Sequence, residues 1–290
     1  MNCSAPTTES TPIFTMRTFL GITHMKAVIK GLMLSMLACG LAHAAEAGDV
    51  ENVRGHLETA VTETPEHTFT GYVGVLSSYN LRGITNAPES DTPALQGSID
   101  YSHASGFYAG YWFSTLSYNY ANLNPDADGS DERKSLESDF YAGYKGTSGD
   151  IGYQIGGTIY YYYPGWESTG YETMLGLSYG DYSLTAQTLL NDVTYGNAGD
   201  TYFVASYSHA LPMDFTFTGK LGAYLYKKDG DFAPETADSV DAGFRHLILG
   251  VTHPLAATGA TMGLDMIVGG YDRYDVKQDN KLVASVSMSF

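Results

Sequence analysis

The sequence predicts an all-β fold, a transmembrane antiparallel β-barrel of about twelve strands with short periplasmic turns and longer extracellular loops. Three observations support this. Segments of alternating apolar and polar residues run from Thr68 to the last residue, the connections between them alternate between long and short, and the final segment has one fully apolar face. Alternating segments of about ten residues separated by turns are typical of outer-membrane barrels.

The last segment, residues 281–290, shows the pattern most clearly. One face carries Leu282, Ala284, Val286, Met288 and Phe290, and the other carries Lys281, Val283, Ser285, Ser287 and Ser289. A free edge strand with an apolar face would aggregate in water. Lipid solves this problem if the last strand pairs with the first, since a closed barrel has no edge. We therefore expect Phe290 to end the strand that closes the barrel.

The remaining segments give an even strand number, as single-chain bacterial barrels require. Segments 200–209 and 240–253 alternate poorly, so we expect a bulge or a register error in each. The predicted strands are 68–80, 93–103, 107–118, 135–146, 150–163, 170–179, 181–190, 200–209, 214–226, 240–253, 260–271 and 281–290.

The connections carry independent information because long and short ones alternate without exception. A soluble β-sandwich has no reason to show this alternation. Since the short turns of such barrels are periplasmic, the long connections are expected outside the cell. The long ones are 81–92, 119–134, 164–169, 191–199, 227–239 and 272–280, and the short ones are 104–106, 147–149, Gly180, 210–213 and 254–259.

Aromatic residues cluster where strands meet connections, as the interfacial girdles of a membrane barrel do. Tyr161, Tyr163 and Trp166 stand at a long loop and predict the outer girdle. The predicted inner girdle, which flanks a short turn, is formed by Tyr101, Phe107 and Tyr108.

The N-terminal region predicts export. Residues 1–44 are read as an upstream extension plus a signal peptide, with Met16 or Met25 as the true start and cleavage after Ala44. Residues 45–67 are a polar periplasmic leader, and 68–290 are the barrel. Both cysteines, Cys3 and Cys39, lie in the part removed. The predicted location is the outer membrane of a Gram-negative bacterium.

The charge balance bears on partners. The formal net charge is −17, with 15 Lys+Arg against 32 Asp+Glu, which argues against nucleic acid because phosphate binding needs a basic face. The expected partners are outer-membrane lipid, lipopolysaccharide with its divalent ions, and the assembly machinery that would engage the C-terminal strand. The oligomeric state is left open.

Several segments resemble one known family. They are Pro93–Trp112 (PALQGSIDYSHASGFYAGYW), Leu81–Ile84, Glu137–Tyr144, and the stretch from Gly149 to Gly165. Over about 70–180 the chain resembles the TorF family of porin-like outer-membrane proteins. That resemblance implies a porin-like barrel, and it brings neither an established substrate nor catalytic residues.

Charged residues on polar strand faces are expected to face the lumen, where they would set selectivity if a water path exists. In a narrow barrel of this size they could instead bridge across a filled interior. The candidates are Arg82, Asp100, Glu137, Asp139, Lys145, Glu172, Lys220, Arg245 and Asp265.

Other motifs carry weaker signals. His103 and Ser105 resemble the His-x-Ser core of outer-membrane phospholipases, but Gly106 replaces the expected Asn and the motif falls on a predicted turn. The acidic run 126–132 lacks the Gly that a calcium loop needs at its sixth position, so it is read as a solvated loop. The pairs Asp272/Asp275 and Asp229/Asp231 are read likewise, and no metal site or cofactor is expected.

The leading function hypothesis is passive diffusion of small hydrophilic solutes or ions through a narrow lumen, with mild cation preference. The alternatives are a closed structural or surface-interaction barrel and an outer-membrane lipid hydrolase. The last requires His103 and Ser105 within hydrogen-bond reach at the membrane boundary, and an exposed turn would argue against it.

Overall fold

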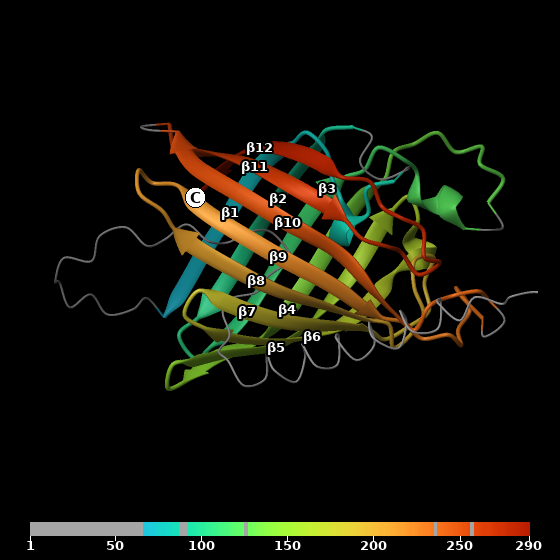
Figure 1. Ribbon diagram of the computed structural model, residues 1–290, viewed down its shortest axis with the longest axis horizontal. Coiled ribbons are helices and arrows are strands. Elements are labelled where there is room, and N and C mark those ends of the chain that lie inside the picture. Colours follow the sequence, from blue (N-terminus) through green and yellow to red (C-terminus); the bar gives the residue numbers. More distant parts are fainter. Residues whose placement is uncertain (1–65, 87–91, 125–126, 235–236, 256–257) are drawn as a thin grey trace, which may run out of the picture. The chain divides into compact units, whose positions relative to one another are not determined.

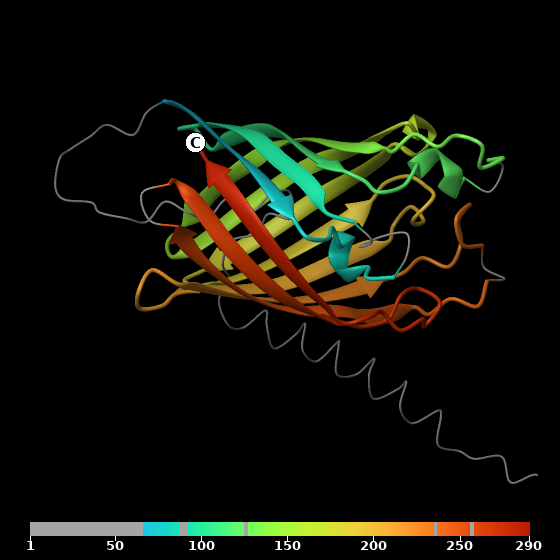
Figure 2. The same ribbon diagram turned by 90° about the horizontal axis from the view of Figure 1, so that it is seen from above.

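The computed structural model describes residues 66–86, 92–124, 127–234, 237–255 and 258–290. The predicted signal peptide and nearly all of the predicted leader lie outside these residues. Within them, twelve antiparallel strands close into a barrel (Figures 1 and 2). The strands are β1 (His67–Leu76), β2 (Ala94–His103), β3 (Phe107–Thr115), β4 (Leu136–Ser148), β5 (Ile151–Tyr163), β6 (Gly170–Tyr179), β7 (Tyr182–Leu189), β8 (Thr201–Ala210), β9 (Thr216–Leu225), β10 (Ala242–Leu255), β11 (Ala260–Gly269) and β12 (Lys281–Ser289).

Each strand pairs with its neighbours in sequence, and β1 also pairs with β12. The closure ends at Phe290, whose backbone N–H donates to the carbonyl of Gly71 (2.9 Å) and whose carbonyl accepts from the N–H of Gly71 (3.0 Å). A side chain at position 71 would meet the Phe290 ring, with 2.6 Å between an added Cβ and the nearest ring carbon. The predicted closed barrel is therefore confirmed, and glycine permits the closing contact.

Every predicted strand corresponds to an observed one. The main difference is β1, which ends at Leu76 instead of residue 80 because the chain there turns away from the wall. The predicted bulge in 240–253 is confirmed, since the register of β10 with β9 shifts between Phe244 and His246. The same expectation was wrong for β8, whose pairing is regular on both sides. Its alternation is weak because apolar Val204 and Tyr202 are buried on the inward face.

The two faces of the wall have opposite polarity. Outward residues such as Ile99, Ile155 and Leu282 are more than half exposed, while inward Gln96 and Gln187 are buried. A protein in water would not leave so broad an apolar surface uncovered. None of the described helices, η1 (Leu81–Gly83), η2 (Tyr120–Leu123) and η3 (Trp166–Ser168), is long and apolar enough to cross a membrane.

Connections alternate in length around the ring, as predicted. The long ones gather at one end of the barrel, on the right in Figure 1, and the short ones at the other. We refer to these as the long-loop end and the short-turn end. The long connections occupy 77–93, 116–135, 164–169, 190–200, 226–241 and 270–280.

Candidate functional site

The connection after β1 folds into the barrel at the long-loop end. Its turn, η1, places Arg82 in the left-handed region (φ 47°, ψ 40°), followed by Gly83 at φ 71°. A Cβ at position 83 would lie 2.5 Å from Cβ of His246 on β10. Glycine therefore serves both the backbone conformation and the close approach of the turn to the barrel wall.

The side chain of Arg82 reaches strands on the other side of the lumen. Its Nη1 donates to Oε1 of Glu172 (2.9 Å) and its Nη2 to Oε2 (2.6 Å), a two-point contact with a carboxylate on β6. It also donates to the hydroxyls of Tyr160 (3.1 Å) and Tyr224 (3.0 Å) on β5 and β9. The guanidinium carbon lies 4.8 Å from the ring centroid of Tyr202 on β8. One side chain thus links a turn between β1 and β2 to four distant strands.

The backbone of the turn is fixed as well. Arg245, in the β10 bulge, donates from Nε to the carbonyl of Arg82 (3.1 Å). Thr85 donates its N–H to Oε1 of Gln278 (3.1 Å) and its hydroxyl to the carbonyl of Asp279 (2.7 Å). The bulge therefore serves to aim Arg245 at the turn, and the turn is bound to the connection before β12.

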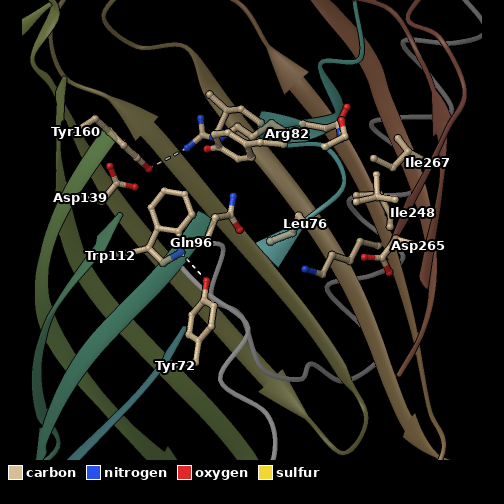
Figure 3. Close-up of a pocket in the computed structure, with 16 residues that line it drawn as sticks. Tyr72, Leu76, Arg82, Gln96, Trp112, Asp139, Tyr160, Ile248, Asp265 and Ile267 are labelled. Carbon is tan, nitrogen blue, oxygen red and sulfur yellow. Dashed lines mark hydrogen bonds between the residues drawn. The ribbon is translucent and has the colours of Figure 1, made fainter. Parts of the chain in front are cut away.

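A cavity of about 190 Å³ lies inside the barrel next to this turn (Figure 3). One wall carries Trp112, Asp139 and Tyr160, which are register partners on β3, β4 and β5. Trp112 Nε1 donates to the hydroxyl of Tyr72 (2.7 Å). Asp265, Ile248 and Ile267 lie on the facing wall (Figure 3), and Lys220 and Val283 also line the cavity.

Three carboxylates are buried near the turn. Glu172 is bound by Arg82 and by the hydroxyl of Tyr160 (2.8 Å), and Glu137 accepts from the hydroxyl of Tyr162 (3.0 Å). Asp139 is 3% exposed, and its Oδ1 has no hydrogen-bond partner among the residues that the structure describes. These three carboxylates form one buried layer beside the turn, and Arg82 forms its ion pair with only one of them, Glu172.

Two of the other predicted lumen residues, Asp100 and Lys145, do not line this cavity. Asp100 accepts from the hydroxyls of Ser98 (2.6 Å) and Tyr141 on the inner face nearer the short-turn end. Lys145 is near that end, with Nζ 5.9 Å from the ring centroid of Tyr108. Lys220 and Asp265 both line the cavity.

Comparison with known proteins gives a family. A family model described as "Bacterial protein of unknown function (Gcw_chp)" matches residues 60–232. The chain belongs to the Gcw_chp family. That description does not carry the TorF name, so the TorF resemblance stays a prediction. No curated protein sequence matches the chain.

Several solved barrels are similar to this Gcw_chp protein at low identity. "KdgM porin" is 9% identical, with a TM-score of 0.47 over 77% of this chain and 99% of that one. The NanC porin is 12% identical, with a TM-score of 0.43 over 76% of this chain and 99% of that one. Outer membrane phospholipase A from Escherichia coli is 12% identical, with a TM-score of 0.42 over 76% and 95%. Similarity at this level says nothing about solute or activity.

The long loops of the Gcw_chp barrel are tied together by contacts that sequence reasoning missed. Arg273 forms a buried ion pair with Asp200 and donates to the carbonyl of Lys227 (2.8 Å), which joins three loops. Asn197, fully buried, donates to the carbonyls of Lys227 (2.8 Å) and Ala233 (2.7 Å). In sequence these residues look like ordinary solvated loop residues, so no local signal marks them.

An aromatic cluster joins the connection 116–135 to the connection 190–200 through Tyr162 on β5. The rings of Tyr120 and Tyr162 stack with centroids 3.7 Å apart, and Tyr195 meets both edge-on. Burial raises the pKa of the Tyr195 hydroxyl well above its ordinary value. The alternation of the Tyr160–Tyr163 run explains this cluster, since Tyr160 and Tyr162 point inward.

Most of the predicted girdle residues lie on the outside. Tyr163 and Trp166 are more than half exposed, Tyr161 and Phe107 are also exposed, and Tyr101 packs between Phe69 and Phe107. The prediction that Tyr108 belongs to the inner girdle was wrong. Tyr108 is 7% exposed, points inward and accepts a hydrogen bond from Gln154 (2.8 Å). It alternates with Phe107, so the two neighbours cannot share the outer face.

The His103 motif sits on an exposed turn at the short-turn end. His103 Nδ1 lies 2.7 Å from Oγ of Ser105, so hydrogen-bond reach is met. The backbone N–H of Ser105 donates to the same nitrogen (3.1 Å), so these are the local bonds of a single turn. The exposed placement argues against the lipid hydrolase.

Two histidines and a glutamate also meet at this end, a grouping that the sequence did not indicate. His67 and His103 are register partners, and they and Glu66 each place a ligand atom within 4.8 Å of the other two. His103 Nε2 lies 3.4 Å from Oε1 of Glu66. All three lie at the solvent-accessible rim, where such groups are common without a metal.

The acidic connections behave as solvated loops where they are described. Residue 126 of the run 126–132 lies outside the described residues. The hydrogen bonds with Arg133 lower the pKa of Asp131 well below its ordinary value. Asp272 accepts from the N–H groups of Tyr274 (2.8 Å) and Val276 (2.9 Å), which is turn chemistry.

Proposed function

We propose that this protein is an outer-membrane, porin-like channel for the passive diffusion of small hydrophilic solutes or ions, with a mild preference for cations. The observation that carries the proposal is the inverted polarity of the closed wall, apolar outside and charged inside. Membrane barrels with a polar interior conduct when that interior leaves a water path.

The proposed location follows from the outer surface. An apolar band with exposed aromatic residues towards both ends suits a bilayer with its two interfaces. In this proposal the long loops face the outside of the cell and the short turns face the periplasm. The predicted signal peptide supplies the export route.

The proposed cation preference rests on the balance of interior charge. Five of the candidate residues are carboxylates and four are basic, and one of the basic ones, Arg82, is already paired with Glu172. Rings of acidic side chains favour cations in membrane pores. The excess is small, so the expected selectivity is mild.

A second candidate, a closed barrel whose loops interact with partners at the cell surface, is favoured by the turn itself. Arg82 crosses the lumen and its contacts hold the turn there. In the channel proposal the same turn is a constriction that narrows the path. Loops tied by Arg273 and Asn197 would suit either role.

Single-channel recording separates the two candidates. Refolded protein comprising residues 45–290, in a planar bilayer under a salt gradient, is expected to give discrete steps and a reversal potential that leans to cations. The substitutions Asp139→Asn, Glu172→Gln and Asp100→Asn should each reduce that lean. Folded protein that conducts neither as wild type nor as Arg82→Gly would overturn the channel and leave the closed barrel.

The proposed assembly partner is the outer-membrane machinery that inserts barrels, engaged through β12 and Phe290. Deleting Phe290 removes the backbone pair with Gly71 and the aromatic end of the closing strand. In bacterial cells the deletion should lower the fraction of folded, heat-modifiable barrel in the outer membrane. An unchanged folded fraction would remove Phe290 from the proposed signal.

A further inference from the structure

We propose that the cavity beside Asp139 binds a small organic cation, an ammonium group that carries alkyl substituents. In the membrane this cavity would be the selectivity site of the channel, and that role rests on the proposed function. The binding itself does not, because it concerns only the cavity and its lining.

Within the part of the chain that the structure describes, the Asp139 carboxylate lacks the partners that a buried charge requires. It is buried inside the wall and its Oδ1 has no hydrogen-bond partner among the described residues. Buried charges in proteins are paired or hydrogen-bonded because the loss of water is costly. An unpartnered carboxylate oxygen that lines a cavity is therefore a place where a bound cation restores the missing interaction.

Negative charge predominates on the side of the cavity that carries Asp139. Arg82, which also lines the cavity, makes its two-point contact with Glu172 and donates to the hydroxyls of Tyr160 and Tyr224. Glu137 adds another buried carboxylate next to Asp139 along β4. On the facing wall lie Asp265 and Ile248 (Figure 3), and Lys220, the register partner of Ile248, also lines the cavity. The Asp139 side of the cavity thus has an excess of negative charge.

The chemistry of the cavity lining favours an organic cation. Asp139 stands between the inward residues Trp112 and Tyr160 in the same register row, and Tyr79 packs against Trp112 with ring centroids 5.9 Å apart. Aromatic faces attract cations, and Trp does so most strongly. Directly opposite residues on paired strands have Cβ atoms roughly 5 Å apart, so Trp112 and Tyr160 flank Asp139 on the wall of the cavity.

Apolar groups complete the site. Leu76, Ile248, Ile267 and Val283 line the same cavity and can cover methyl or methylene groups. A hard metal ion such as Ca²⁺ would need about 6–8 oxygen ligands, which this mixed aromatic and aliphatic lining does not suit. The cavity of about 190 Å³ compares with about 30 Å³ for each water in the liquid, so it has room for a small organic ion.

The two tryptophans of the chain allow a direct binding test. Trp112 lines the cavity, whereas Trp166 is 56% exposed on the outside, so Trp166→Phe leaves Trp112 as the only reporter. The folded Trp166→Phe protein in detergent micelles is titrated with ethanolammonium, ethylene glycol and glycolate. These probes have similar size and carry positive, zero and negative charge.

We expect a saturable change in Trp112 fluorescence with ethanolammonium and none with ethylene glycol or glycolate. Asp139→Asn, in the same background, should weaken ethanolammonium by roughly tenfold or more, as loss of a buried charge partner does. Asp139→Glu should restore part of the affinity. The control is Asp181→Asn, an exposed carboxylate between β6 and β7 that does not line the cavity, and it should leave the affinity unchanged.

Equal responses to the three probes, no response to any, or equal affinity in the Asp139→Asn and Asp181→Asn proteins would overturn the proposal. Circular dichroism and heat-modifiability on gels confirm that each variant is folded. Conductance measurements on the same proteins distinguish the channel proposal from the cation-site proposal. A barrel that binds ethanolammonium without conducting refutes the channel alone, and one that conducts without binding it refutes the cation site alone.

Discussion

Arg82 and Glu172 meet across the lumen in a two-point contact, with Nη1–Oε1 and Nη2–Oε2 distances of 2.9 and 2.6 Å. The two residues are 90 positions apart, one on the turn after β1 and the other on β6. Their side chains are 8% and 3% exposed. The pair therefore holds the long connection between β1 and β2 against a distant part of the wall.

Removing the arginine should cost stability. Arg82→Ala leaves Glu172 buried without its cation, and loss of one partner of a buried pair costs about 3–5 kcal/mol. Urea unfolding in lipid vesicles is expected to show a loss of that order. The double variant Arg82→Ala, Glu172→Gln should lose less than the sum, with a coupling of roughly 0.5–3 kcal/mol. Arg133→Ala, which breaks an exposed pair with Asp131, is the control and should cause no measurable loss. If the losses of unfolding free energy in the two single variants simply added up in the double variant, Arg82 and Glu172 would not stabilise the barrel as a pair.

Displacing the turn should raise the conductance. Gly83→Ala places a Cβ 2.5 Å from the His246 side chain, so the turn must move from the wall. Gly129→Ala is a matched control, because Gly129 has a similar φ (69° against 71°) but no atom within 4 Å of its added Cβ. Both variants carry the same left-handed strain, and only Gly83→Ala is expected to increase single-channel conductance. Equal conductance in the two would show that the turn does not limit the path.

The wall of the barrel was predictable from sequence because its rules are local. The alternation of apolar and polar residues predicted which face of each strand points outward. The lengths of the connections predicted which end of the barrel carries the long loops. The β12 pattern around Val286 led to the closing strand, and its pairing with β1 is observed. Weak alternation at 240–253 led to the bulge, because a bulge shifts the parity of the following residues.

The interior was less predictable because its contacts join residues far apart in the chain. Arg82 was expected to face the lumen, but nothing near it in sequence indicates that its turn enters the barrel and pairs with Glu172. The Arg273–Asp200 pair has the same character, since two loop charges look solvated until the fold brings them together. Tyr108 shows the limit of clustering as a guide, because only alternation with Phe107 reveals which of two adjacent aromatic residues faces lipid.

The outer surface gives a test of membrane embedding. Ile99, near the middle of β2, and Leu190, in a long loop, are both 57% exposed. In a bilayer Ile99→Lys should destabilise the barrel by about 2–4 kcal/mol, whereas lysine near or beyond the interface costs about 0–1 kcal/mol. Urea unfolding in vesicles should therefore separate Ile99→Lys from Leu190→Lys. Equal effects would mean that the outer face of β2 does not meet hydrocarbon.

The ion pair between Arg273 and Asp200 should limit the access of a protease to the long loops. Both side chains are 5% exposed, and Arg273 also holds the carbonyl of Lys227, which precedes another lysine. Arg273→Ala removes the cation from buried Asp200 and frees the 226–241 connection, so trypsin should cut after Lys227 or Lys228 faster than in the wild type. Mass spectrometry of timed digests measures this rate.

Arg133→Ala, at an exposed pair in another loop, is the control and should leave the rate unchanged. Because the strands are hydrogen-bonded around a closed ring, the barrel itself should resist digestion in both variants. Unaltered cleavage in Arg273→Ala would show that the other contacts, including those of Asn197, suffice to hold the loops.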